Sequence, residues 1–93
     1  MDAWLTLEDL SHACRVECAA IVEWVELGAV QARGDSPGTW RFDEREFVSA
    51  ARLARLAREF DLPPFAAALV DDLVRDRQRL ERRVHSLERL LRS

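Results

Sequence analysis

The sequence predicts a mainly α-helical protein, in which a small head is followed by one long helix. Two observations support this prediction. The first is that residues 62–93 begin with two prolines and then hold no glycine or proline, so no residue interrupts a helix there. The second is that residues 1–61 hold short apolar segments at helical spacing, with capping and turn residues at their ends. We therefore expect two units, a head at residues 1–61 and a coiled-coil-type helix at residues 62–93.

The long helix carries a seven-residue hydrophobic repeat of the kind found in coiled coils. Its a and d positions are apolar with the exception of one arginine: Val70, Leu73, Arg77, Leu80, Val84, Leu87 and Leu91. A lone helix would expose this narrow seam to water, so we expect these residues to form a dimerisation seam with a second copy of the chain. Arg77 lies at an a position, where a polar residue costs stability and can fix the register.

The sequence alone leaves the arrangement of this helix open. In a parallel, in-register pair, Arg83 meets Glu88 favourably, whereas Asp76 meets Glu81 with like charge. The charges therefore do not decide between parallel and antiparallel pairing. The helix could instead fold back on its own head. We do not expect this, because the seam extends over more than ~30 Å of helix, which is too long for so small a head to cover.

The first third of the chain predicts two short helices joined by a tight turn. Thr6 and Asp9 form a capping-box pattern, which starts a helix at residues 7–13. A second helix begins at Glu17 and is stopped by Gly28. The residues expected to face inward are Leu7 and Leu10 in the first helix and Cys18, Ile21, Val22 and Val25 in the second. Two helices of this size with a short turn predict a helix-turn-helix.

A small hairpin and a third helix are expected to complete the head. Residues 30–33 can form a short strand, residues 34–38 are dense in turn residues, and residues 39–42 are rich in β-forming residues, so the three together predict a wing. Asp43 with Glu46 predicts a second capping box. It opens a helix at about residues 44–60, whose residues expected to pack on the helix-turn-helix are Phe47, Ala51, Ala54 and Phe60.

The chain offers little chemistry for a metal site or an active site. His12, Cys14 and Cys18 have soft-ligand character, but a structural zinc site usually needs four ligands, so we expect small buried cysteines instead. No phosphate-binding glycine loop and no nucleophile motif occurs. There is no long apolar run and no signal-peptide pattern. We therefore expect a cytoplasmic protein that is not an enzyme and needs no metal or cofactor.

The distribution of charge argues against DNA as the main partner. The second helix would be the recognition helix of a DNA-binding helix-turn-helix, but its outward positions carry Glu17, Glu23 and Glu26, which repel phosphates. What remains for DNA is a set of arginines on the wing and the third helix: Arg41, Arg45, Arg52, Arg55 and Arg58. Such a set is more often a solvated face paired with neighbouring acids, so we expect no nucleic-acid partner.

The same acidic face suits a basic protein partner, whose approach it can steer. Trp24 and Trp40 are candidate anchors for such a partner, because tryptophan often dominates interface energy. The alternative is that both tryptophans are core residues of a small domain. Asp71, Asp72 and Asp76 form a further acidic cluster near the start of the long helix. A helical run of acids with no histidine or nucleophile beside it is usually just solvated.

With these elements in order, the chain resembles the MerR-like winged helix-turn-helix group and, within it, the chaperone-modulator CbpM family. The resemblance covers nearly the whole chain, and its specificity lies in the order and spacing of short segments. Those segments are LTLEDL at residues 5–10, VELGAV at 25–30, TWRFD at 39–43, RLARL at 52–56 and AALVDDL at 67–73, followed by the Arg- and Leu-rich end.

The resemblance implies a function that composition alone does not. Members of the CbpM family bind the J-domain of a CbpA-type Hsp40 co-chaperone and stop it from stimulating its Hsp70 partner, without catalysis or a cofactor. The resemblance does not say which acids make the contact. We favour Asp71, Asp72 and Asp76, with Glu23 and Glu26 second, as acids that cover the basic helix that a J-domain presents to Hsp70. The alternative is a MerR-like transcriptional regulator that binds promoter DNA through the wing with Arg52 and Arg55, and the acidic second helix argues against it.

Overall fold

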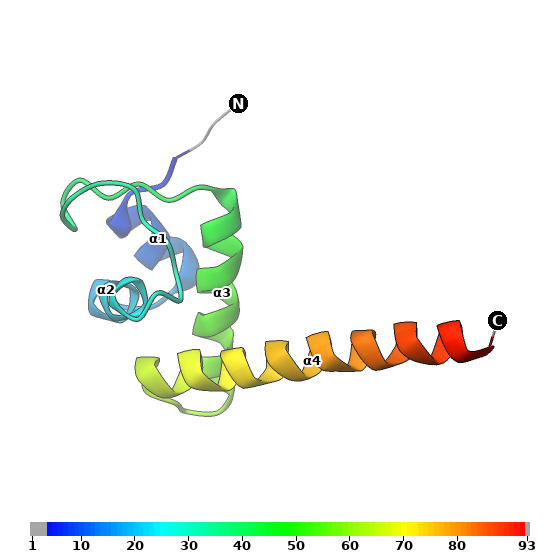
Figure 1. Ribbon diagram of the computed structural model, residues 1–93. Coiled ribbons are helices and arrows are strands. Elements are labelled where there is room, and N and C mark those ends of the chain that lie inside the picture. The colour runs from blue at the N-terminus through cyan, green and yellow to red at the C-terminus, as the bar shows by residue number, and fades with distance from the viewer. Residues whose placement is uncertain (1–3, 93) are drawn as a thin grey trace.

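The computed structural model describes residues 4–92, and these form four helices. The helices are α1 (Leu7–Cys14), α2 (Cys18–Glu26), α3 (Glu44–Glu59) and α4 (Pro64–Arg92). Figure 1 shows α1, α2 and α3 gathered in a head, from which α4 extends as a long arm. The prediction of a mainly α-helical head with a long C-terminal helix is therefore confirmed.

The capping box at the start of α1 is confirmed. The Thr6 hydroxyl accepts a hydrogen bond from the Asp9 backbone N–H at 3.1 Å, and the Asp9 carboxylate accepts one from the Thr6 N–H at the same distance. Both bonds satisfy backbone donors that the first turn of a helix would otherwise leave unpaired. The hydrogen bond from the Thr6 N–H also lowers the pKa of Asp9 below its usual 3.8.

Thr6→Ala is expected to lower the free energy of unfolding by about 1 kcal/mol, because it removes the hydroxyl that caps α1. The shift can be measured from urea unfolding, and Thr6→Ser, which keeps the hydroxyl, should unfold close to the parent. The lowered pKa of Asp9 means that its ionised form favours the folded chain. That contribution is present above the ordinary pKa and is lost as the pH falls through the lowered one. A Thr6→Ala chain as stable as the parent at pH 7 would contradict the cap.

The end of α2 is also as predicted. α2 stops at Glu26, and Gly28 follows with φ of 80°, in the left-handed region that favours glycine. The backbone N–H groups of Ala29 and Val30 both donate to the carbonyl of Trp24, at 2.9 and 3.3 Å. This turn fixes where the chain leaves α2 and leaves Leu27 exposed beside it.

The predicted wing is wrong as a regular hairpin. The described residues contain only isolated bridges, one between Arg33 and Arg41 and one between Leu5 and Phe42. Arg41 exchanges two backbone hydrogen bonds with Arg33, at 2.8 and 3.0 Å, and Phe42 exchanges two with Leu5 on its other side, at 2.8 and 2.9 Å, but neither ladder continues beyond one residue pair. The segment at residues 34–39 is exposed throughout and has no apolar face to bury. The predicted wing is therefore a loop whose two ends are joined by the bridge between Arg33 and Arg41.

The second predicted capping box is only half formed. The Asp43 carboxylate accepts from the Glu46 backbone N–H at 3.0 Å, as expected. The Glu46 carboxylate, however, accepts from the backbone N–H of Gln31 at 2.8 Å and not from Asp43. The loop after α2 brings this N–H to the start of α3, and a side chain that satisfies it ties the two segments together.

The core of the head lies where α1, α2, α3 and the first turns of α4 meet. Its largest fully buried side chains are Trp24, Phe42, Leu10, Ile21, Leu53 and Val30. α3 and α4 pack on each other, and each buries small residues, among them the fully buried Ala54 of α3 and Ala67 of α4. The expectation that Phe60 packs inward is wrong, because Phe60 caps the C-terminal end of α3 and is 63% exposed.

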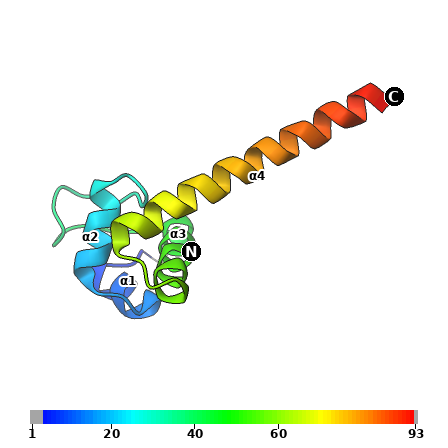
Figure 2. The same cartoon turned by 90° about the horizontal axis from the view of Figure 1, so that it is seen from below.

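Most of α4 lies outside the head. Only Ala67, Ala68 and Asp71 of this helix are buried, whereas the seam residues Leu73 and Leu80 are each 61% exposed. Figures 1 and 2 show α4 crossing the head at its start and then running clear of it. The alternative that this helix folds back on its own head is therefore wrong. Pairing with a second copy remains a prediction. None of the four described helices is long and apolar enough to cross a membrane.

Candidate functional site

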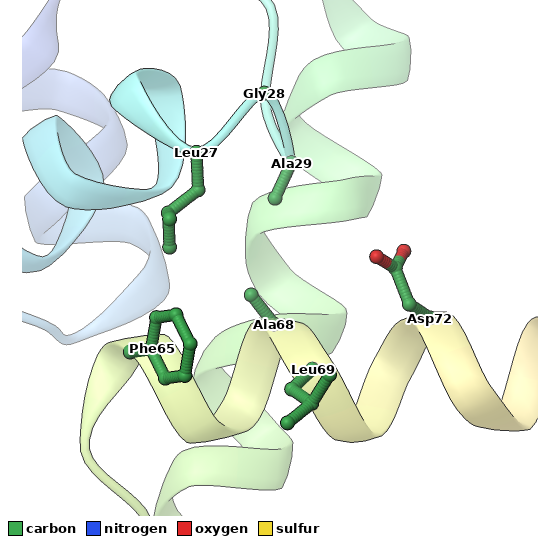
Figure 3. Close-up of a pocket in the computed structure, with 7 residues that line it drawn as sticks. All are labelled: Leu27, Gly28, Ala29, Phe65, Ala68, Leu69 and Asp72. Carbon is green, nitrogen blue, oxygen red and sulfur yellow. The ribbon is translucent and has the colours of Figure 1, made fainter.

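A shallow groove lies between the end of α2 and the start of α4 (Figure 3). Its volume is about 150 Å³, and more of its lining is apolar than polar. The residues that line it are Leu27, Gly28, Ala29, Phe65, Ala68, Leu69 and Asp72. We call this the α2–α4 groove. Leu27, Phe65 and Leu69 are each about half exposed, at 45%, 56% and 51%, so together they present an apolar surface to solvent.

Two features of the sequence build this groove. The glycine at the end of α2 turns the chain sharply, and a Cβ added to Gly28 would meet nothing within 4 Å, so the turn stays open on its outer side. Trp24 is fully buried, and its Nε1 donates to the backbone carbonyl of Pro64 at 2.8 Å. This bond holds the first turn of α4 against α2, and it therefore sets the positions of the side chains from α4 that line the groove.

Carboxylates flank the apolar surface. Asp72 lines the groove and is exposed, and it has no ion pair among the described residues. Asp76 lies one turn further along the same face of α4, exposed, with Arg79 at 3.0 Å. Glu26, which precedes Leu27, is exposed at the end of α2. An apolar floor with an acidic edge fits an amphipathic, basic segment of a protein partner.

Asp71 is not an exposed contact residue, and its prediction as one is wrong. Its side chain is 8% exposed and accepts from Arg52 Nε at 2.7 Å and Arg52 Nη2 at 3.3 Å, while Arg75 lies 3.8 Å away. It points to a different face of α4 from Asp72, because adjacent helical residues lie about 100° apart. The pair joins α3 to α4. Sequence reasoning grouped Asp71 with Asp72 and Asp76 by closeness in the chain and not by helix face.

The two candidate tryptophan anchors are core residues. Trp24 is fully buried and Trp40 is 9% exposed, with its ring edge-to-face against Phe42 at a centroid distance of 6.2 Å. Neither ring offers a surface to a partner, so the anchor role predicted for them is wrong and the alternative of core residues is confirmed. Glu23, by contrast, is half-buried and lines a second groove, which lies between α2, the end of α3 and the start of α4 and also includes Glu17 and Ala57.

The arginines proposed for DNA binding are partly engaged within the head. Arg52 is bound to Asp71, and Arg58 donates from Nη1 to the carbonyl of Cys14 at 2.9 Å. Arg55 lies 4.0 Å from Glu59 on the same helix. Since a phosphate contact needs an available guanidinium, these contacts weaken the case for a DNA-binding surface on α3.

The cysteines lie apart from the groove. Cys14 is buried, and its burial raises the pKa of the thiol above the usual 9.0, so the reactive thiolate is disfavoured. Cys18 is half-buried. Within residues 4–92, no group of three or more histidine, cysteine, aspartate or glutamate side chains is arranged to hold a metal ion.

Sequence reasoning missed the apolar part of the site. Leu27, Phe65 and Leu69 were not singled out, although Phe65 and Leu69 are apolar residues of the long helix that lie outside its a and d positions. That was the available signal, because an apolar residue outside the seam needs a second partner surface. Their closeness to Leu27 depends on how α4 crosses α2, which the repeat does not encode.

The comparison with known families defines the class of protein first. The family model described as MerR HTH family regulatory protein matches residues 5–89. A chaperone modulatory protein CbpM of Coxiella burnetii is 31% identical over 85 residues, which cover 91% of this chain and 80% of the relative. A chaperone modulatory protein CbpM of Pseudomonas putida is 32% identical over 76 residues, or 82% of this chain and 75% of the relative. The chain belongs to the CbpM family.

Membership of this family confirms the resemblance found in the sequence. It assigns the chain a chaperone-modulating role. The family names point to a regulatory protein and not to an enzyme. The helix-turn-helix and the long helix are thus those of a MerR-like fold used in the regulation of a chaperone.

Proposed function

We propose that this protein binds the J-domain of a CbpA-type Hsp40 co-chaperone and prevents that J-domain from stimulating Hsp70. The observation that carries the proposal is membership of the CbpM family over 91% of the chain. A J-domain presents a basic helix to Hsp70, and a protein that covers this helix competes directly with Hsp70. Inhibition is then a matter of steric and electrostatic occlusion, with no chemical step.

The α2–α4 groove is the surface that suits this task best. Its floor of Leu27, Phe65 and Leu69 can bury the apolar side of a helix, while Asp72 and Asp76 can face that helix's basic side. Complementary charge mainly raises the association rate and sets the orientation, whereas the buried apolar contacts slow dissociation. Glu26 extends the acidic edge on the α2 side. This assignment keeps the preference for the acids of α4 but removes Asp71 from it.

Titration calorimetry against the isolated J-domain at two salt concentrations tests the proposal. We expect binding that weakens as salt rises, and Asp72→Arg with Asp76→Arg should weaken it by about tenfold or more. Asp35→Arg is the matched control. It reverses one charge in the same way, but on an exposed loop away from the groove, and should bind like the parent. A parallel assay should show that the parent protein, but not the double variant, suppresses J-domain-stimulated ATP hydrolysis by Hsp70.

Two results would overturn parts of this proposal. If the double variant binds as well as the parent, the α2–α4 groove is not the contact surface, and the groove lined by Glu17 and Glu23 becomes the next site to vary. If the parent shows no binding at micromolar concentrations, the assignment of a J-domain partner fails. Binding to promoter DNA is then the function to measure.

A further inference from the structure

The groove that Glu23 lines is larger than the α2–α4 groove. Its volume is about 320 Å³, against about 150 Å³ for the α2–α4 groove. Its lining is mostly apolar and consists of Val16, Glu17, Ala19, Ala20, Glu23, Trp24, Ala57, Leu62 and Pro64. We call it the Glu23 groove. The three alanine side chains end at Cβ, so they leave space that a side chain of a partner can fill.

The two grooves meet at one contact within the head. Trp24 and Pro64, which are joined by the hydrogen bond from the indole Nε1, line the Glu23 groove. Further along each helix, Leu27 and Phe65 line the α2–α4 groove. Figure 2 shows the start of α4 beside α2, and both grooves follow this line of contact. A segment that lies along α2 would therefore pass over both grooves.

The two grooves are spaced along α2 by two helical turns. Ala20 in the Glu23 groove and Leu27 in the α2–α4 groove are seven residues apart, so they share one face of the helix and lie about 10 Å apart along it. Glu23 lies between them on this face and is half-buried. A partner helix that lies along α2 presents every seventh residue at the same interval. The matching occupant is a helix with two apolar side chains seven residues apart.

The acids of the Glu23 groove are available to a cation. Within residues 4–92, neither Glu17 nor Glu23 has an ion-pair partner, and Glu17 makes no capping hydrogen bond although it is the N-cap residue of α2. Asp71 and Asp76, by contrast, have arginine nitrogens at 2.7 and 3.0 Å. An incoming lysine or arginine would therefore pair with the acids of this groove without first breaking a contact inside the head.

We infer that the partner occupies both grooves at once, as one basic helix that lies along α2. One apolar side chain enters the Glu23 groove between Ala20 and Ala57, and a second, seven residues away, packs on Leu27 and Phe65 in the α2–α4 groove. A basic side chain between them pairs with Glu23. This inference rests on the proposed function, because it specifies what the J-domain helix must carry.

Filling the Glu23 groove tests whether the partner uses it. Ala20→Leu adds volume there without a change of charge and should weaken J-domain binding by about fivefold or more in titration calorimetry. Ala13→Leu, the same change at an exposed position of α1, is the matched control and should bind like the parent. The stoichiometry should stay at one J-domain per chain in each case, because one helix fills both grooves.

Glu23→Gln tests the charge of the groove with almost no change of volume. It should weaken binding by about threefold or more and make binding less sensitive to salt. Glu8→Gln, at an exposed position of α1, should change neither property. Because this variant adds no volume, it still tests the groove if urea unfolding shows that Ala20→Leu destabilises the head.

Alanine scanning of the basic helix of the J-domain tests the spacing. Two apolar positions seven residues apart should each cost about tenfold in affinity when changed to alanine. One of them should lose its effect against the Ala20→Leu variant and the other against Leu27→Ser, because each such pair of changes acts on a single contact. Sensitive apolar positions at a different interval would contradict a single helix that lies along α2.

The outcomes distinguish this inference from the proposed function. If the parent binds the J-domain and both Ala20→Leu and Glu23→Gln bind as well as the parent, the Glu23 groove is unused and the inference alone is wrong. Binding of two J-domains per chain, one of which is lost in Ala20→Leu, would show separate sites and would also overturn it. If the parent binds no J-domain, the proposed function fails, and the inference fails with it.

Discussion

Trp24→Ala is expected to destabilise the head by about 3–5 kcal/mol, which is a large part of the roughly 5–15 kcal/mol that stabilises a typical domain. Trp24 is fully buried at the meeting point of α2 and α4, so the substitution would leave a cavity in the core. The substitution also removes the Nε1 donor and leaves the Pro64 carbonyl without that hydrogen bond. Urea unfolding should show a much lower midpoint or a chain that is already unfolded in water.

Two further variants separate packing from hydrogen bonding. Trp24→Phe keeps most of the apolar volume but loses the donor, so it should cost clearly less than Trp24→Ala. Trp4→Ala is the control for removal of an indole, because Trp4 is 40% exposed and only stacks on the Arg33 guanidinium at 5.1 Å. It should cost no more than about 1 kcal/mol. Equal losses for Trp24→Ala and Trp4→Ala would contradict the central place of Trp24 in the core.

Asp71→Asn is expected to lower the free energy of unfolding by about 2–3 kcal/mol. The value lies between those of exposed and buried ion pairs, because the Asp71 side chain is 8% exposed while Arg52 is 31% exposed. The change keeps the volume but removes the charge that two nitrogens of Arg52 contact. The measurement is again urea unfolding at pH 7. The slope of the unfolding free energy against urea concentration should equal that of the parent, so that the change in midpoint reports stability.

Asp72→Asn is the matched control for this prediction. It makes the same substitution one residue away, on the exposed face of α4, and should change the free energy of unfolding by no more than about 0.5 kcal/mol. A second check is the double variant Arg52→Met with Asp71→Met, which removes both charges and should recover part of the loss. If Asp71→Asn and Asp72→Asn are equally mild, the ion pair does not hold α3 to α4.

The sequence predicted the helices well because their ends carry local signals. Thr6, Asp43 and Gly28 act on the backbone within a few residues, so caps and stops can be found without knowledge of the fold. The second capping box failed for the opposite reason, because Glu46 bonds to Gln31 in a different segment of the chain. The bridge between Phe42 and Leu5 likewise joins segments that are distant in sequence, so no local pattern predicts it.

The candidate site was predicted only in part. Its acids on α4 were visible as a cluster in the stretch that resembles the CbpM family, and Asp72 does line the α2–α4 groove. Asp71 was misplaced because position along the chain was used where helix face decides exposure. Trp24 and Trp40 were weighed as anchors or as core residues, and burial settles that choice. The apolar floor could be predicted only with knowledge of how α4 crosses α2. That crossing arises from the packing of small residues and from the hydrogen bond between Trp24 and the Pro64 carbonyl.

α4 is fastened to the head at two levels, by Trp24 at Pro64 and by Arg52 at Asp71, seven residues or about 10 Å apart along the helix. A single attachment would let α4 pivot about it, whereas two attachments to different helices of the head, α2 and α3, oppose both tilting of α4 and rotation about its own axis. α4 therefore projects from the head in a defined direction and rotation. In the predicted dimer, its length would set the spacing of the heads, and the number of residues between the attachment points and the seam would set their relative rotation. Adding seven residues would move the heads apart with nearly the same facing, whereas adding one would turn each groove by about 100°.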